Sequence, residues 1–439
     1  MARGTSFLRV FLCALALGWA LTGGARASGY GLREATSASA FGNAFAGATS
    51  SAEDISFMHF NPAGLTRHTG TQVVIGGTAI LPEARFQGGS ASNFLGTPIP
   101  GSQSDKDAAP DAVAPLFYGM WETSPDTRVG LGITVPWGLT TDHPSDWIGR
   151  YHAIETRFVA VNVNPAAAYR INRRLSIGAG LQIQYGDGTL SNAVDFGTLA
   201  FGVPSLDDDG RAEIKADGWG FGFNFGVLYE PVDGTRIGLG YRSSISHTLK
   251  GDTEFSGALA PAFDPLFTDT VGRAKLTTPE ILSFGVTHEI NSRWTVMAEI
   301  AWTNWSRFQE LRIRFDNPAQ PDDVTLAQWD DAMFYSLGAT YRASDNWRIR
   351  GGLAFDESPV PDSTRNPRIP DEDRLWVALG ASYRGFKGVT IDVSFVHFFI
   401  DDADIDLSSA QTGNTFRGNL SGSFELTANL FAVQAVIPF

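Results

Sequence analysis

Apolar and polar side chains alternate one by one along many short stretches of this chain. In the stretch 294–303, Val296 and Ile300 fall on one face, whereas Thr295 and Glu299 fall on the other. The stretches 237–242 and 348–356 repeat the pattern. Because successive side chains of a strand point to opposite faces, this period of two predicts strands with one apolar face. Alternation alone leaves open whether that face packs in a soluble core or faces lipid.

Short and long connections alternate between these stretches. Six tight turns rich in Pro, Asn, Asp, Ser or Gly lie at 124–127, 172–174, 232–234, 291–293, 344–346 and 385–388. Seven long connections lie near 87–111, 136–155, 187–210, 251–271, 316–331, 357–371 and 406–423. These connections separate fourteen strands of about 10 residues, enough for a tilted strand to cross a bilayer. Short turns on one side and long loops on the other predict an all-β fold, a 14-stranded antiparallel transmembrane β-barrel over residues 71–439.

The beginning of the chain has the layout of a secretory signal peptide. Arg3 and Arg9 precede an apolar run from Val10 to Leu21, and Ala25-Arg26-Ala27 is a small-x-small cleavage site. The run is about 12 residues, too short for a spanning helix, although a short membrane anchor is the alternative. We therefore expect residues 1–27 to be a signal peptide and the rest of the chain to be exported.

Composition and the last strand extend this interpretation. The formal charge of −14 disfavours nucleic acid as a partner. No zinc-ligand spacing, phosphate loop or nucleophile elbow is present, so we expect no cofactor, no metal site and no enzyme activity. Alternate residues from Phe431 to the terminal Phe439 are apolar, which resembles the signal read by the barrel-assembly machinery, although an ordinary edge strand is the alternative. We expect a monomer in the outer membrane of a Gram-negative cell, in contact with its lipid and lipopolysaccharide.

Residues 28–70 differ from the rest of the chain, because they show no strand alternation. They are rich in Ser, Ala and Gly, too apolar for a solvated tail and too short for an independent domain. A barrel of fourteen strands encloses a wide lumen. We therefore expect this region to fold into the lumen as a plug, or hatch, of short helices.

Three motifs in this region give the sequence a family resemblance. Ser28-Gly29-Tyr30-Gly31-Leu32, Gly42-x-Ala44-x-Ala46-Gly47 and Asn61-Pro62-Ala63-Gly64-Leu65 resemble the N-terminal hatch of the FadL family. Stretches 136–139, 165–171 and 175–181 resemble the third to fifth strands of the same family. FadL proteins are outer-membrane channels for long-chain fatty acids, and related members take up aromatic hydrocarbons. The resemblance implies passive uptake of hydrophobic molecules through a surface groove, a lumenal pocket and a lateral exit at a kink in the third strand.

Candidate residues can be assigned to the gate and to capture. Asn61, Pro62, Ala63 and Gly64 are our candidates for gating or anchoring the hatch, with a plain turn as the alternative. By analogy with the family, Ser28, Gly29 and Tyr30 reach the ligand pocket. The loops after the fifth and seventh strands are unusually apolar, which is typical of a binding surface, although they can also pack on each other. Their candidate capture residues are Phe196, Leu199, Phe201, Leu259, Phe263 and Phe267.

The carboxylate of a fatty acid requires a cation, and arginine can bind it through two parallel hydrogen bonds. The candidates are Arg170, Arg242, Arg348 and Arg350. The alternative is that these arginines pair with lumenal acids such as Glu299 and Asp392. Acidic clusters in the loops are interpreted as a solvated rim, with Ca²⁺ binding as the alternative. A lipase-like barrel enzyme and a surface adhesin or receptor remain alternatives for the whole chain.

Overall fold

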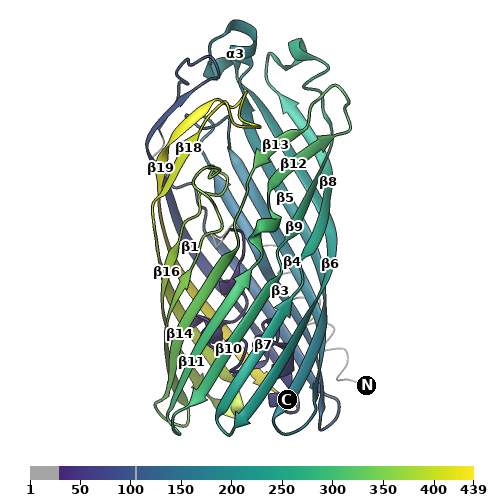
Figure 1. Cartoon of the computed structure of the whole chain (residues 1–439), viewed down its shortest axis with the longest axis vertical. Coiled ribbons are helices and arrows are strands. Elements are labelled where there is room, and N and C mark those ends of the chain that lie inside the picture. Colours follow the sequence, from purple (N-terminus) through teal and green to yellow (C-terminus); the bar gives the residue numbers. More distant parts are fainter. Residues whose placement is uncertain (1–28, 104–105) are drawn as a thin grey trace.

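The computed structural model describes residues 29–103 and 106–439, so the predicted signal peptide and Ser28 lie outside the described residues. Its sheet closes on itself as a barrel (Figure 1). Fourteen antiparallel strands form the ring: β1 (Thr71–Ser92), β2 (Ala112–Glu122), β3 (Thr127–Asp142), β4 (Glu155–Arg170), β5 (Leu175–Val194), β6 (Gly210–Val232), β7 (Thr235–Arg242), β10 (Ile281–Glu289), β11 (Trp294–Thr303), β14 (Ala332–Arg342), β15 (Trp347–Asp356), β16 (Arg374–Arg384), β17 (Thr390–Ile400) and β19 (Asn419–Pro438). The ring closes where β1 pairs with both β2 and β19.

Five further strands extend the wall above the ring. They are β8 (Ile245–Ser256), β9 (Thr270–Thr278), β12 (Glu310–Phe315), β13 (Asp323–Leu326) and β18 (Ala403–Leu407). Each lies next in sequence to a ring strand, so β7, β10, β11, β14 and β17 are each the lower part of an interrupted strand. β8 pairs with β6 and β9, and β9 pairs with β12. The predicted 14-stranded barrel is therefore confirmed, with five strands divided into two pieces.

The turns agree with the sequence prediction, but several long loops are shorter than predicted. β3 continues to Asp142 and β5 to Val194, inside the segments predicted as loops, and β13 lies within the predicted loop 316–331. The physical reason is that pairing persists here, with Thr141 opposite Thr156 and Val194 opposite Gly210. Above the lipid a strand no longer needs an apolar outer face, so its alternation fades although its hydrogen bonds remain.

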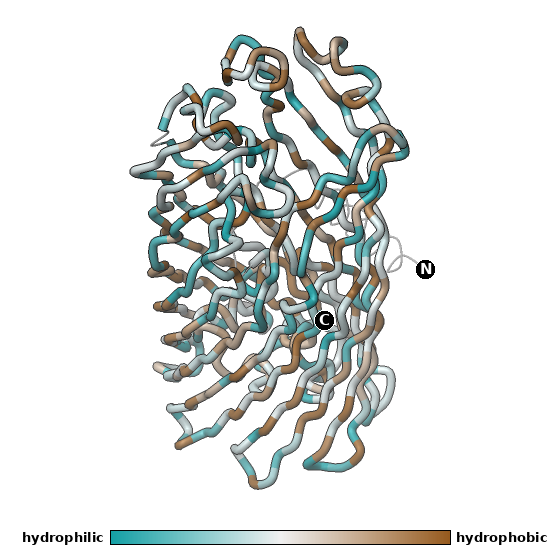
Figure 2. The backbone as a smooth tube through the Cα atoms, turned by 45° about the horizontal axis from the view of Figure 1, so that its top comes forward, coloured by the Kyte–Doolittle hydropathy of each residue, from teal (hydrophilic) through white to brown (hydrophobic). Residues whose placement is uncertain are grey.

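The apolar faces of the strands point outward. On β15 the exposed fractions of Ile349, Leu353 and Phe355 are 51%, 55% and 41%, whereas the intervening Arg350 is buried. Val296 and Ile300 on β11 are likewise exposed. Figure 2 shows apolar and polar residues alternating along the strands around the wall. Large apolar side chains exposed on every side are expected of a wall in contact with lipid, which resolves the question that alternation left open. Within residues 29–103 and 106–439, no helix is long and apolar enough to cross a membrane.

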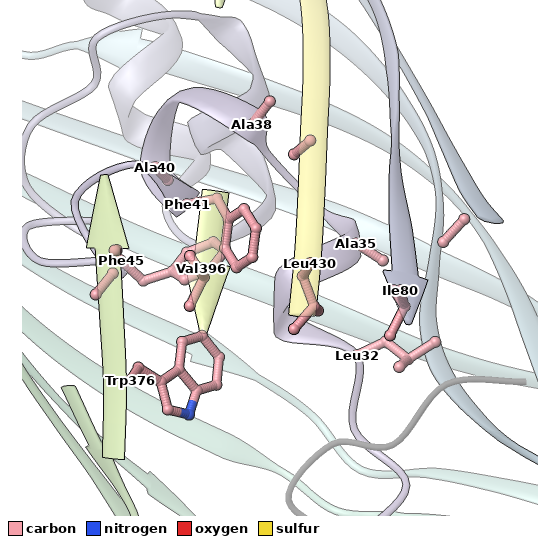
Figure 3. Packing of buried hydrophobic residues seen from close by; sticks show 14 of the residues in the cluster. Leu32, Ala35, Ala38, Ala40, Phe41, Phe45, Ile80, Trp376, Val396 and Leu430 are labelled. Carbon is pink, nitrogen blue, oxygen red and sulfur yellow. The ribbon is translucent and has the colours of Figure 1, made fainter. Parts of the chain in front are cut away.

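Short helices occur in two places. Residues 29–70, here called the N-terminal segment, contain η1 (Arg33–Ala35), α2 (Ala38–Phe41), η2 (Ile55–His59) and η3 (Pro62–Arg67) and lie inside the lower barrel (Figure 1). Loops and turns carry α3 (Phe196–Phe201), η4 (Leu206–Asp208), η5 (Ala260–Phe263), η6 (Trp305–Arg307) and η7 (Phe386–Gly388). The largest buried apolar cluster joins the N-terminal segment to the wall, with Phe41 and Phe45 against Trp376 and Val396 (Figure 3). This part of the core therefore lies in the lower lumen, between the N-terminal segment and the wall.

Candidate functional site

A buried polar network holds the middle of the N-terminal segment to the wall. Asp54 caps η2, because its Oδ1 accepts a hydrogen bond from the backbone N–H of Ser56 at 2.7 Å. Its Oδ2 accepts from Nε2 of Gln434 on β19 at 2.9 Å, and Oε1 of Gln434 accepts from the N–H of Ala38 at 2.9 Å. One side chain of the wall thus binds both α2 and the cap of η2.

Asn61 of the predicted gate joins three parts of the molecule. Its Oδ1 accepts from the N–H of Ala63 at 3.0 Å and so caps η3. Its Nδ2 donates to the carbonyl oxygen of Thr49 at 2.8 Å and to that of Val227 on β6 at 2.9 Å. Pro62 is the first residue of η3, where a missing N–H costs nothing. The motif is therefore more than a plain turn, because it binds the segment to itself and to the wall.

The wall under this motif is made of glycine. Gly178, Gly226 and Gly240 lie opposite one another on β5, β6 and β7, and we call them the glycine row. A Cβ at Gly226 would lie 2.0 Å from Oδ1 of Asn61, and one at Gly178 would lie 2.5 Å from the backbone nitrogen of Ala63. Any side chain in this row would displace the segment, since these distances are far below van der Waals contact.

The beginning of the N-terminal segment is held differently, by a single antiparallel β-bridge between Gly31 and Trp137 of β3. The N–H of Leu32 donates to the carbonyl oxygen of Pro136 at 2.8 Å. The N–H of Gly138 donates to the carbonyl oxygen of Tyr30 at 2.9 Å. The N–H of Gly29 donates to Oδ2 of Asp371 at 3.0 Å. The ring of Tyr30 lies 4.7–5.9 Å from five other rings, which we call the aromatic cage: Trp137, Phe158, Trp305, Phe308 and Trp329.

β3 is irregular at the place where this segment touches it. Its register with β4 shifts between Thr134 and Trp137, which is a β-bulge next to Pro136. Its pairing with β2 ends at Ile133, which lies opposite Phe117. Beyond this pair, β3 continues for nine more residues, and β2 has five residues before Phe117 that do not pair with β3. Between these unpaired portions the wall lacks the hydrogen bonds that close it elsewhere. The family resemblance implied a kink in this strand, and the bulge is the feature found there.

A groove with a volume of about 780 Å³ lies at the end of the barrel that carries the long loops. We call it the apolar groove; its lining includes Leu190, Leu199, Ile214, Phe255, Phe263, Phe267, Leu311, Ile313 and Phe315. Phe196 is fully buried behind it, stacked on Phe263 at 5.1 Å between ring centroids and edge-on to Phe267 at 5.0 Å. The two apolar loops therefore pack together and, in doing so, form part of the groove.

The six predicted capture residues do not all meet at the groove. Leu199, Phe263 and Phe267 line it, whereas Phe196 supports it from behind. The side chain of Phe201 is 66% exposed, and neither it nor Leu259 is among the lining residues.

The four predicted head-group arginines are dispersed. Nη2 of Arg350 lies 2.6 Å from Glu53 and Nη1 lies 3.1 Å from Asp392, so Arg350 pairs with acids as the alternative proposed. Arg170 donates to the carbonyl oxygen of Thr66, and Arg348 lines a cavity beside the turn 344–346. Arg242 donates to the carbonyl oxygen of His59 at 2.8 Å and lines a small central cavity of about 70 Å³. None of the four lines the apolar groove.

The central cavity also holds an unusual carboxylate. Glu34 of η1 is fully buried, and neither of its carboxylate oxygens has a hydrogen-bond partner among the described residues. Burial raises the pKa of Glu34 to about 8, so its neutral form predominates at pH 7. Burial lowers the pKa of the neighbouring His59. The cavity beside the aromatic cage therefore carries less charge than its residues suggest.

Several acids of the loop clusters pair with arginines. Nε of Arg150 lies 2.6 Å from Asp209, Arg417 pairs with Asp323, and Arg365 pairs with Glu372. The part of the chain that the structure describes contains no group of three or more His, Cys, Asp or Glu arranged to hold a metal ion. These carboxylates join the loops to one another.

Sequence reasoning missed the aromatic cage and the loop 357–373. The cage consists of rings from distant parts of the chain, and of these only Tyr30 and Trp137 lie in motifs that resemble the family. The loop folds inward: Val360 belongs to the cage cluster, and Arg368 reaches Thr156 and Asn192. An arginine-containing loop with buried positions gives no periodic signal, so pattern analysis could not find it.

Comparisons with known proteins agree with this architecture. The sequence profile of the family described as outer membrane protein transport protein (OMPP1/FadL/TodX) matches residues 18–439. The long-chain fatty acid transport protein of Escherichia coli is 30% identical over 406 residues, covering 84% of this chain and 88% of that protein. The crystal structure of a Pseudomonas aeruginosa FadL homologue superposes with a TM-score of 0.87 at 23% identity, covering 94% of this chain and all of that one. The toluene transporter TodX of Pseudomonas putida superposes with a TM-score of 0.67 at 19% identity, covering 94% and 99%.

The profile match covers nearly the whole chain, so it does not rest on the hatch motifs alone. The relatives are transport proteins of the outer membrane, which places this barrel in that membrane and excludes the enzyme alternative. The chain belongs to the OMPP1/FadL/TodX family of outer-membrane transport proteins.

Proposed function

We propose that this protein takes up long-chain fatty acids passively, from the apolar groove through the plugged lumen to a lateral exit between β2 and β3. The observation that carries the proposal is the apolar groove of about 780 Å³. Its volume is in the range of about 300–1,000 Å³ typical of small-molecule sites. An apolar groove of this size on a surface that faces water is expected to bind a hydrophobic ligand.

The lateral exit is supported by the bulge of β3 and by the end of its pairing with β2. A hydrophobic molecule gains nothing from an aqueous pore to the periplasm, whereas an opening in the wall delivers it to lipid. The N-terminal segment fills the lumen below, which supports a plug in the region 28–70 followed by a barrel over 71–439.

In this proposal the two predicted gating motifs have different roles. Asn61, Pro62, Ala63 and Gly64 anchor the plug on the glycine row. Gly29 and Tyr30, with Ser28 before them, act as the movable gate, because the bonds of Tyr30 and Leu32 reach β3 at its bulge. Displacement of Tyr30 would empty the aromatic cage and uncover the unpaired part of β3.

Aromatic hydrocarbons are the second candidate cargo. The aromatic cage favours them, since three tryptophans and two phenylalanines around Tyr30 offer ring edges and faces to a planar ligand. The E. coli relative is named for fatty acids and the P. putida structure for toluene, so the family contains both. A monomer inserted by the barrel-assembly machinery, with lipid and lipopolysaccharide around its apolar outer face, completes the proposal.

Uptake by whole cells tests this function. The full chain is expressed in a Gram-negative strain that lacks its own fatty-acid transporter, and the initial uptake of tritiated oleate and of labelled toluene is measured. We expect the chain to restore oleate uptake. Restored toluene uptake alone would select the second cargo, and restoration of neither would contradict the transport proposal.

A further inference from the structure

One arginine lines the apolar groove without a carboxylate partner. Arg368 lies on the loop 357–373, and its side chain is only 6% exposed. The next residue, Ile369, packs against the cluster of the aromatic cage. Arg368 therefore lies between the groove and the cage, where a ligand moving inward would pass.

The guanidinium of Arg368 is surrounded by neutral oxygen atoms. Nη1 donates to the hydroxyl of Thr156 at 3.2 Å and to the carbonyl oxygens of Glu155 and Ser191 at 3.3 Å. Nη2 donates to Oδ1 of Asn192 at 3.2 Å. Within residues 29–103 and 106–439, no carboxylate forms an ion pair with Arg368 and no acceptor is found for its Nε. All four contacts are long, and part of the guanidinium edge is left for another acceptor.

The other arginines of this region are neutralised. Arg417 lines the same groove but pairs with Asp323 and donates to Thr325 at 2.9 Å. Arg365, on the same loop as Arg368, pairs with Glu372. Burial and the nearby charge of Arg417 lower the pKa of Arg368, and the carboxylate of Asp323 opposes this only in part. A buried cation without a counter-ion is costly, and an incoming anion would relieve that cost.

We propose that Arg368 binds the carboxylate of a long-chain fatty acid whose hydrocarbon chain lies in the apolar groove, so that this residue makes the groove selective for acids over uncharged hydrocarbons. Arginine binds carboxylates through charge-assisted hydrogen bonds. The groove lining also contains Arg417 and four acids, but Arg417 pairs with Asp323, Glu213 pairs with Lys215 and Asp322 pairs with Arg312. Among the described lining residues Arg368 is therefore the cation without an ion pair, and apolar walls beside it match an amphiphile. This proposal rests on the groove being the capture site of the proposed function and names the residue that selects its cargo.

The test compares two ligands that differ only in their head group, which is a charged carboxylate in one and a neutral hydroxyl in the other. Oleate and oleyl alcohol share the same hydrocarbon chain, and the thermal stabilisation of the full-length protein in lipid nanodiscs by each is measured at pH 7.5. Charged hydrogen bonds contribute about 1.5–3 kcal/mol, so Arg368→Gln is expected to weaken oleate binding about tenfold or more. Binding of oleyl alcohol is expected to stay unchanged, and Arg368→Lys is expected to retain part of the preference for oleate.

Arg365→Gln is the matched control, because Arg365 lies on the same loop as Arg368 but pairs with Glu372 and is not among the residues that line the groove. It is expected to leave the preference for oleate over the alcohol nearly unchanged. Heat-modifiable migration on gels checks that each variant forms a barrel. Equal weakening of both ligands by Arg368→Gln would mean that Arg368 only holds the loop, and no weakening would mean that it does not meet the ligand; either result overturns the proposal.

Uptake measured in parallel separates this inference from the proposed function. If the wild-type protein binds oleate through Arg368 but restores no uptake in cells, the transport proposal fails and the binding site stands. If uptake of oleate is restored and is as fast in Arg368→Gln as in the wild type, the selectivity inference fails and transport stands.

Discussion

The two parts of the N-terminal segment are held inside the barrel by different kinds of contact. Residues 37–66 lie on glycines of the wall and are bound to it by buried side-chain hydrogen bonds of Asp54 and Asn61. Residues 29–35 depend on the ring of Tyr30, on two backbone hydrogen bonds to β3 and on one from Gly29 to a loop. The hydroxyl of Tyr30 also donates to the carbonyl oxygen of Thr277, the hydroxyl of Thr78 donates to the carbonyl oxygen of Glu34, and Arg33 lies over the ring of Phe334. The first part is in tight contact with the backbone of the wall, whereas the second is held by fewer bonds to it. In the proposed function, one continuous segment therefore serves as both plug and gate.

The largest expected effect comes from Gly226→Val, which disturbs the contact of residues 37–66 with the wall. A Cβ here would lie 2.0 Å from Oδ1 of Asn61, so the cost should exceed the roughly 1–3 kcal/mol typical of overpacking. We expect the plug to detach and the conductance of the barrel in planar bilayers to rise.

The control for this variant is Gly351→Val. A Cβ at Gly351 would have its nearest neighbours at 3.9 Å, so the plug should stay in place and the conductance should remain low. A closed barrel in Gly226→Val would contradict the view that the glycine row is required for docking.

Tyr30→Ala is expected to have the next largest effect, and it removes the main apolar contact of residues 29–35. Removal of a buried aromatic side chain costs about 3–5 kcal/mol in a rigid core. We expect hydrogen exchange of residues 29–35 to become fast while that of residues 37–66 stays slow. Phe201→Ala, at a side chain outside the cage, is the control. Acceleration of both parts together would show that they are not independent.

Asn61→Ala should have a smaller effect, and it should accelerate hydrogen exchange in the second part of the segment rather than in residues 29–35. It removes a helix cap and two hydrogen bonds, each contributing about 1 kcal/mol. We expect faster exchange in residues 49–66, lower oleate uptake and normal barrel assembly on gels. Normal uptake by a well-folded Asn61→Ala protein would remove Asn61 from the function.

A change of pH tests the same part of the segment through Glu34, whose carboxylate is buried close to Arg33 and Arg374. The pKa of Glu34 rises from 4.5 to about 8 on burial, so its neutral form favours the folded gate. This stabilisation is full below pH 4.5 and is lost as the pH rises towards about 8. After correction for intrinsic exchange rates, residues 29–35 should open more often between pH 5 and 8. Glu34→Gln should remove this dependence, and a pH response that persists in that variant would assign it to another group.

The sequence predicted the wall better than the contents of the lumen. Alternation in 294–303 and the turn-forming residues identified strands and their faces, because both depend on neighbours in the chain. Asn61-Pro62-Ala63 was found because it is a local motif. Its partners, Val227 and the glycine row, were not predicted, since the register between the plug and the wall depends on contacts between distant residues.

The arginines illustrate the same limit. Strand periodicity correctly placed Arg350 on the inner face, but its partner Glu53 lies 297 residues away in the sequence. Arg368 is in a loop, where no period tells whether a side chain is buried or paired. Patterns thus predict the direction of a side chain, whereas its electrostatic partner requires the folded chain.

The loop 357–373 carries both Arg368, which lines the groove, and Asp371, which accepts the hydrogen bond of Gly29. Two steps of the proposed route, binding of the head group and release of the gate, therefore involve the same loop. If an anion bound at Arg368 shifts this loop, it changes the free energy of holding Gly29, and thermodynamic reciprocity requires that the position of Gly29 change the affinity of the groove by the same factor. A transporter without any energy source could in this way adjust its outer affinity to the state of its own gate.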